Sequence, residues 1–240
     1  MIQNQSFSLG ETAVSFAFAP PVTNDSTNLW PVFILCGDGS VYFAFLNKEK
    51  KSQNLMGPLT MLPESQDNYG LDFCAILCLH PQISSPPILV LATSRGNLFH
   101  CIVLAKDDES LETASQISDW SNFDSIPVDL ALYVYENVQL ELSLLSQEEE
   151  KSPFDYPLLL SHDNFSPSRY FCSHKAGIHS VSLPMVSQLA ELARAPEESA
   201  MNSMPTEQES VVQHLVCTQL FAKNSPSPVQ GENLFQIRKT

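Results

Sequence analysis

The stretch PVFILCGDGSVYFAF, residues 31–45, decides the fold of this 240-residue sequence. Two apolar runs flank a short turn that contains Gly37, Asp38 and Gly39. Asp-Gly between apolar runs is a strong hairpin signal, because a two-residue turn needs positive φ angles, which glycine adopts without steric cost. The segment therefore predicts two antiparallel strands joined by a tight turn.

The same shape occurs twice more along the chain. ILVLATSRGNLFHCIVL, residues 88–104, turns at Gly96, and RYFCSHKAGIHSVSL, residues 169–183, turns at Gly177. An apolar run precedes each hairpin and a further strand candidate follows it, so the sequence predicts a four-stranded antiparallel unit repeated about three times. Such units are typical of β-propeller blades. The outer strand candidates of the three units are residues 13–18 and 55–62, 74–79 and 132–144, and 157–161 and 211–220.

Some of the predicted strands are apolar at consecutive positions, as in residues 88–91. Strands of this kind need cover on both faces, which blades stacked face to face provide. One helix is predicted at residues 186–193, where apolar positions repeat with helical spacing between Pro184 and Pro196. Residues 211–220 follow a sequence that fits a helix start, but we predict a strand there because the repeat requires one.

The composition excludes several classes of function. The formal net charge of −15 would repel phosphate backbones and argues against direct binding of nucleic acid. No apolar stretch reaches the roughly 18 to 20 residues of a membrane span, so we expect no membrane insertion. The first ten residues are polar, unlike a secretory signal, and the six cysteines are expected to stay reduced thiols.

Two groups of side chains were candidates for a metal site. Cys74 and Cys78 are four residues apart, which places both on one face of a predicted strand, and His80 is the nearest further ligand. Their spacing differs from that of zinc knuckles, and buried packing is the favoured interpretation. His174 and His179 flank the third turn, where a hairpin with polar edges is favoured over a ligand pair.

No complete catalytic motif is present. GDGS at residues 37–40 lacks the lysine and the helix of a phosphate-binding loop, and no hydrolase or zinc-protease motif occurs. We therefore predict no catalytic, cofactor-binding or metal-binding residues and no cofactor. The alternative from another class is a propeller hydrolase, which requires that Asp38, Asp72, His100 and His179 converge on one central channel.

Several aromatic residues lie in or beside predicted loops. Aromatic side chains are enriched in the centres of protein interfaces. We favour the interpretation that these residues pack against the loops of their own domain. They are Trp30, Trp120, Phe123, Phe154, Tyr156 and Phe165.

A series of short motifs occurs in a fixed order along nearly the whole chain, to about residue 231. These motifs and their order resemble those of the N-terminal domain of the nucleoporin 88 family, also called the members only family. The motifs are SLGETAV at 8–14, LCGDGSVY at 35–42, GPL at 57–59 with DNYG at 67–70, CAILCL at 74–79, LYV at 132–134 with LEL at 140–142, PSRY at 167–170 followed by His174, AG at 176–177 and HSV at 179–181, and QHLVCT at 213–218.

The resemblance implies a seven-bladed β-propeller followed by a coiled coil. It implies a structural nucleoporin, not an enzyme, which acts as a scaffold for mRNA and protein export on the cytoplasmic face of the nuclear pore complex. The implied partners are nucleoporin 214 and nucleoporin 62, largely through the coiled coil, and nucleoporin 98 through the propeller. The exportin pathway is affected indirectly. A WD-repeat-like adaptor outside the pore is the other alternative.

The resemblance also sets the expected domain organisation. We expect residues 1–231 to form part of the N-terminal propeller, about three to four blades with one short helix. Residues 232–240 are expected to be a divergent tail, and the coiled coil of the family is expected to be absent. Such a partial propeller would expose strand edges, so we expect poor solubility for the chain expressed alone.

Overall fold

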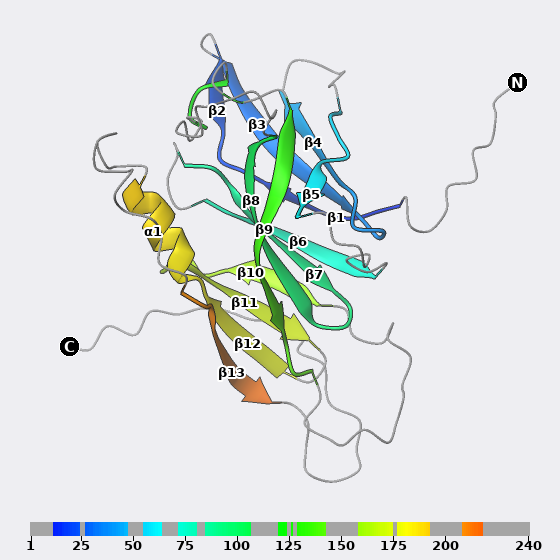
Figure 1. The fold of residues 1–240 in the computed structure, drawn as a ribbon, viewed down its shortest axis with the longest axis vertical. Helices are drawn as coiled ribbons and strands as arrows, with labels where there is room; N and C mark the ends of the chain where they lie inside the picture. Colours follow the sequence, from blue (N-terminus) through cyan, green and yellow to red (C-terminus); the bar gives the residue numbers. More distant parts are fainter. Residues whose placement is uncertain are drawn as a thin grey trace, which may run out of the picture.

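The computed structural model describes residues 12–24, 27–47, 55–63, 72–80, 85–106, 120–123, 126, 129–142, 158–174, 177–192 and 208–217. Within these ranges the chain forms three β-sheets and one short helix (Figure 1). This architecture confirms the predicted all-β fold. The single described helix is too short to cross a lipid bilayer.

The first sheet is arranged around the long strand β3, which pairs with all the others in antiparallel fashion. The hairpin β3–β4 is the one that residues 31–45 predict. The three-residue strand β2 was not predicted, because it is too short to show a periodic pattern. The strands are β1 Ala13–Phe18, β2 Val22–Asn24, β3 Thr27–Cys36 and β4 Val41–Leu46.

The second sheet has five strands in the order β5-β9-β8-β7-β6. Its hairpin β7–β8 matches the prediction for residues 88–104. The strands are β5 Thr60–Leu62, β6 Phe73–Leu79, β7 Ile88–Thr93, β8 Asn97–Ala105 and β9 Leu130–Gln139.

Residues 55–62 differ from their prediction as the last antiparallel strand of the first unit. Met56 forms one bridge with Phe43 of β4, and Thr60–Leu62 then pairs in parallel with β9 of the second sheet. Between them Gly57 has a φ of +115°, and Pro58 has no N–H to donate. The regular ladder with β4 is interrupted there; the Leu59 N–H still donates to the Val41 carbonyl of β4 at 2.8 Å, and the chain then passes to the next sheet.

The third sheet has the order β10-β11-β12-β13 and follows the predicted unit. The helix α1, Pro184–Leu192, leaves β12 with Pro184 in its first turn, where the missing N–H of proline costs nothing. Residues 211–217 form a strand, as the repeat required. All seven of its residues are exposed. The strands are β10 Leu159–His162, β11 Arg169–His174, β12 Gly177–Ser182 and β13 Val211–Cys217.

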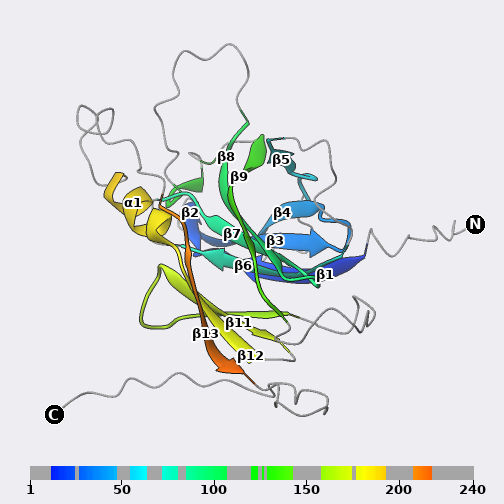
Figure 2. The same cartoon turned by 60° about the horizontal axis from the view of Figure 1, so that its bottom comes forward.

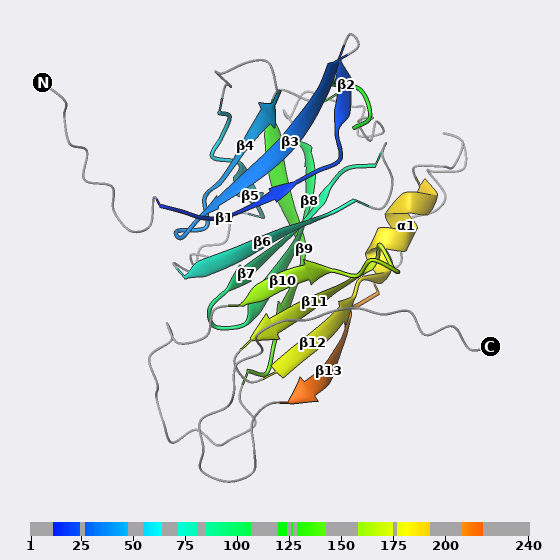
Figure 3. The same cartoon turned by 180° about the vertical axis from the view of Figure 1, so that it is seen from behind.

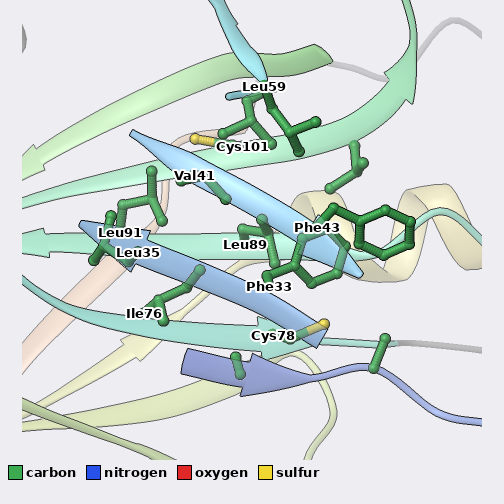
Figure 4. Packing of buried hydrophobic residues seen from close by; sticks show 14 of the residues in the cluster. Phe33, Leu35, Val41, Phe43, Leu59, Ile76, Cys78, Leu89, Leu91 and Cys101 are labelled. Atoms are coloured by element: carbon green, nitrogen blue, oxygen red, sulfur yellow. The ribbon is translucent and has the colours of Figure 1, made fainter. Parts of the chain in front are cut away.

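The second sheet lies between the other two and buries both of its faces (Figure 2). Alternate side chains of a strand point to opposite faces. Leu89 and Leu91 of β7 accordingly join the core shared with the first sheet, whereas Ile88 and Val90 join the core shared with the third. Figure 4 shows the former core, in which Leu89 lies beside Phe33 of β3. The consecutive apolar residues thus have the two-sided cover that the sequence predicted.

The first strands of the three sheets lie next to one another. Strand β6 contacts both β1 and β10, and Figure 3 shows these strands on the same side of the molecule. Each sheet therefore begins at a common inner edge and extends outward from it. This is the radial arrangement of propeller blades.

Cys74 and Cys78 lie on opposite faces of β6, which corrects the prediction that they share a face. A β-bulge between Phe73 and Ala75 adds one residue to the strand and reverses the alternation. Cys78 is buried in the core shared with the first sheet, while Cys74 packs toward the other core and its thiol donates to the Ala92 carbonyl at 3.5 Å. Burial raises the pKa of Cys78 to about 12, so this thiol stays protonated.

The turn glycines place two hairpin tips against neighbouring segments. Gly39 and Gly96 have φ angles of +89° and +91°. A Cβ added to Gly39 would lie 2.6 Å from the Phe73 ring, and the Phe73 N–H donates to the Gly37 carbonyl at 3.2 Å. Asp38 completes the first turn by accepting the Ser40 N–H at 2.9 Å. The first hairpin is therefore closed by its own turn and packs against the second sheet.

Replacing Gly39 by alanine is expected to destabilise the chain by about 1–3 kcal/mol, because the new Cβ would combine a positive φ with a clash against Phe73. Thermal unfolding monitored by circular dichroism measures the loss. Gly37→Ala is the matched control, since Gly37 does not have a positive φ. Equal losses for the two variants would contradict the role assigned to Gly39.

Candidate functional site

The inner strands β1, β6 and β10 line an apolar groove with a cavity volume of about 490 Å³. Phe16 of β1 and Leu159 of β10 are each 63% exposed beside it. Contiguous exposed apolar surface marks protein-binding or ligand-binding sites. The groove is therefore a candidate binding surface.

A second cavity, of about 320 Å³, lies at the ends of the same strands, and its lining includes the side chains of His80, His162, Asp163 and Arg169. Its buried carboxylate, Asp163, is paired with the Arg169 guanidinium at 2.5 Å and accepts the Phe165 N–H at 2.9 Å. Burial lowers the pKa of His80 to about 4 and also lowers the pKa of His162. Both imidazoles are neutral at neutral pH, and Asp163 has the structural role of holding the turn between β10 and β11.

A buried polar link joins the second sheet to the third. The His100 side chain is fully buried, with Nδ1 2.8 Å from Glu136 Oε2 and Nε2 2.8 Å from the Tyr170 hydroxyl. Burial raises the pKa of Tyr170, so the hydroxyl keeps its proton and donates to Nε2. The Nδ1–H then donates to the carboxylate of Glu136. This carboxylate also accepts the Ser210 N–H at 2.7 Å, just before β13.

The stability of the chain is expected to fall between pH 4.5 and 2 partly through Glu136. Burial alone would raise the pKa of this carboxyl, but hydrogen bonds from His100 and Ser210 outweigh it and lower the pKa from 4.5 to about 2. A lowered folded-state pKa contributes stability above the ordinary pKa, and this contribution is lost as the pH falls toward the folded-state value. Urea midpoints measured across this range should fall less steeply in Glu136→Gln than in the unmodified chain. Parallel profiles would contradict the assignment.

The four residues that a propeller hydrolase would need are held in separate contacts. Asp38 binds its own turn, and Asp72 accepts the Ser94 hydroxyl at 2.9 Å and pairs with Arg95 at 3.2 Å. His100 faces Glu136 and Tyr170, as described above, and His179 lies in the third sheet against His174. The structure therefore does not join Asp38, Asp72, His100 and His179 into one catalytic group.

The structure does bring together His174 and His179, the pair that the sequence placed beside the third turn. His174 Nε2 lies 2.9 Å from His179 Nδ1. Sequence reasoning missed a third member, His214, whose donor atoms lie with theirs inside a span of 4.8 Å. Gly177, the predicted turn glycine, begins β12 opposite His174 with a φ of +154°.

The stacked sheets and their shared inner edge define the class of protein as part of a β-propeller. Two solved structures share this fold. One is the crystal structure of the Chaetomium thermophilum heterotrimeric Nup82 NTD–Nup159 TAIL–Nup145N APD complex, with a TM-score of 0.51 and 15% identity over 80% of this chain and 50% of that chain. The other is the yeast heterotrimeric Nup82–Nup159–Nup116 nucleoporin complex, with a TM-score of 0.55 and 12% identity over 89% of this chain and 57% of that chain. The present chain thus spans about half the length of these structural relatives.

The sequence identifies the family directly. The family model described as "Nup88: Nuclear pore component" matches residues 2–240. The chain belongs to this family of nuclear pore components. The predicted boundary at residue 231 lies outside the described residues and stays a prediction.

Proposed function

We propose that this chain is a structural nucleoporin of the cytoplasmic face of the nuclear pore complex, where it serves mRNA and protein export as a scaffold. The observation that carries the proposal is the match to the nuclear pore family over residues 2–240. The mechanism is surface complementarity, without bond making. The apolar groove along β1, β6 and β10 and the exposed edge strand β13 are surfaces suited to this role.

Nucleoporin 214, nucleoporin 62 and nucleoporin 98 are the proposed partners. The two fold relatives are themselves complexes of Nup82 with Nup159 and with Nup145N or Nup116, which supports assembly with other nucleoporins. An effect on the exportin pathway would be indirect, through these partners. The net charge of −15 supports protein partners over nucleic acid.

The test is co-purification and imaging of the tagged 240-residue chain in cells. The expected result is a signal at the nuclear rim and enrichment of the three proposed nucleoporins. His100→Ala, which removes the link between the second and third sheets, should reduce this enrichment because it lowers the folded fraction of the chain. Tyr133→Phe is the control, since it removes only one exposed hydrogen bond, to the Ala105 carbonyl.

Two outcomes would contradict the proposal. A diffuse distribution with non-pore partners would favour the WD-repeat-like adaptor. Capture that is equal for the unmodified chain and for His100→Ala would show that the nucleoporins adhere to an unfolded chain rather than to the propeller surface.

A further inference from the structure

Three imidazoles meet on one face of the third sheet. His174 ends β11, His179 lies in β12 and His214 lies in β13. One nitrogen from each ring lies within 4.8 Å of the other two. The ring centroids of His179 and His214 are 4.3 Å apart, and those of His174 and His179 are 5.0 Å apart. His174 and His179 are buried, whereas His214 is exposed.

Strand register explains why these three residues converge. His174 pairs with Gly177, and His179 pairs directly with His214 across the β12–β13 ladder. Side chains of directly paired residues stand on the same face of a sheet. His174 and His214 are 40 positions apart in the sequence. The pairing of β12 with β11 on one side and with β13 on the other nevertheless brings both residues next to His179.

The missing side chain of Gly177 makes room for the third ring. A Cβ at this position would lie 2.6 Å from His214 Nε2 and 1.9 Å from the Val216 carbonyl oxygen. Any other residue would therefore displace the His214 imidazole or the backbone of β13. Gly177 is thus required for the cluster as well as for the hairpin.

The donor set fits a borderline divalent cation. Three imidazoles are a known ligand set for Zn²⁺, which leaves a fourth tetrahedral position for water. Two nitrogens bound to one tetrahedral Zn²⁺ lie about 3.3 Å apart, given Zn–N bonds of roughly 2.0–2.1 Å. The observed 2.9 Å between His174 Nε2 and His179 Nδ1 is close to this value. The exposed His214 ring needs only a side-chain movement to complete the set.

The rings also have the required protonation state. Burial, and to a smaller extent the neighbouring His214, lowers the pKa of His174 to about 4. Burial also lowers the pKa of His179 to about 4, with smaller contributions from His214 and His174. A neutral imidazole has a nitrogen lone pair available for a metal ion, whereas a protonated imidazole must first lose its proton. The proton shared between His174 Nε2 and His179 Nδ1 moves to an outer ring nitrogen when both atoms bind metal.

We propose that His174, His179 and His214 form a Zn²⁺ site that clips the edge strand β13 to the β11–β12 hairpin. The site holds strands that are separated by α1 and by residues 193–207 in the sequence. Its role is structural: the metal completes the blade rather than performing a reaction. This proposal does not depend on the pore function.

Titration of the purified 240-residue chain with ZnCl₂ and with CoCl₂ at neutral pH tests the site. We expect one ion per chain, visible d–d absorption of tetrahedral Co²⁺, and a melting temperature raised by roughly 5–10 °C at a hundredfold excess over Kd. Hydrogen–deuterium exchange of residues 211–217 should slow when Zn²⁺ is added. Each readout reports metal binding without requiring any activity.

His214→Ala is the decisive variant, because the side chain is exposed and its loss leaves the cores intact. We expect its Zn²⁺ affinity to fall by at least about tenfold to a hundredfold, since even outer-sphere partners of metal ligands contribute this much. His179→Gln should give a similar loss. His162→Gln is the control: it removes an exposed imidazole of β10 that is not part of the cluster and should leave affinity unchanged. Absence of stoichiometric binding, binding unaffected by His214→Ala, or binding abolished by His162→Gln would each overturn the proposal.

Discussion

His100→Ala is expected to destabilise the chain by about 2–5 kcal/mol, because it leaves two hydrogen-bonding groups, one of them the carboxylate of Glu136, without their partner. The substitution deletes both hydrogen bonds of the fully buried imidazole, to Glu136 and to Tyr170 at 2.8 Å each. The Glu136 carboxylate and the Tyr170 hydroxyl would then lack their partner at the junction of two sheets. Urea denaturation followed by circular dichroism measures the difference.

Two further variants separate this link from ordinary hydrogen bonding. Tyr170→Phe removes one of the two bonds and should cost about 1–3 kcal/mol, because His100 Nε2 is left buried without its donor. Tyr133→Phe removes a solvent-exposed hydrogen bond from the half-buried Tyr133 to the Ala105 carbonyl at 3.2 Å and should change stability by less than about 0.5 kcal/mol. If His100→Ala were as mild as Tyr133→Phe, His100 would not connect the sheets.

Phe43→Ala is expected to cost about 3–5 kcal/mol, the range for truncation of a buried aromatic residue. Phe43 is fully buried, and its ring centroid lies 4.9 Å from that of Phe33 and 4.8 Å from that of Phe45. Trp120, at 6.2 Å, covers the same cluster from a separate segment. Figure 4 shows Phe43 beside Phe33 in the core between the first and second sheets. Tryptophan fluorescence during urea unfolding would follow the loss.

Phe165→Ala is the matched control for this truncation. Phe165 is 51% exposed, and the contact that fixes its turn is made by its backbone N–H, which alanine retains. The expected change is within about 0.5 kcal/mol. Similar losses in both variants would mean that the aromatic cluster around Phe43 is not a stabilising core.

Local signals in the sequence were sufficient for the hairpins and for the stacking of sheets. Asp38-Gly39 between apolar runs specifies a turn through backbone conformation alone, and residues 88–91 specify burial on two faces through composition alone. Trp120 is 2% exposed, in agreement with the interpretation that loop aromatics pack within the domain, whereas Phe165, 51% exposed, departs from it; Phe154 and Tyr156 lie outside the described residues. These properties depend on few residues that are close in sequence.

The features that escaped prediction depend on register and on irregularities of the strands. The bulge near Phe73 places Cys74 and Cys78 on opposite faces of β6, and no residue in the sequence indicates that a bulge forms there. The proximity of His214 to His179 depends on the pairing of β12 with β13 across residues 183–210, a length that leaves the register open. The parallel pairing of β5 with β9 likewise joins segments that have no shared local pattern.

The two-sided burial of β6, β7 and β8 affects how this region tolerates sequence change over evolutionary time. In a strand with one face exposed to solvent, every second residue can be replaced by a polar one without loss of buried contacts. In β7 all six residues are buried, so neither set of alternate positions tolerates polar substitutions. We therefore expect aliphatic residues to be retained at consecutive positions of the central sheet, whereas polar substitutions should accumulate in exposed strands such as β13.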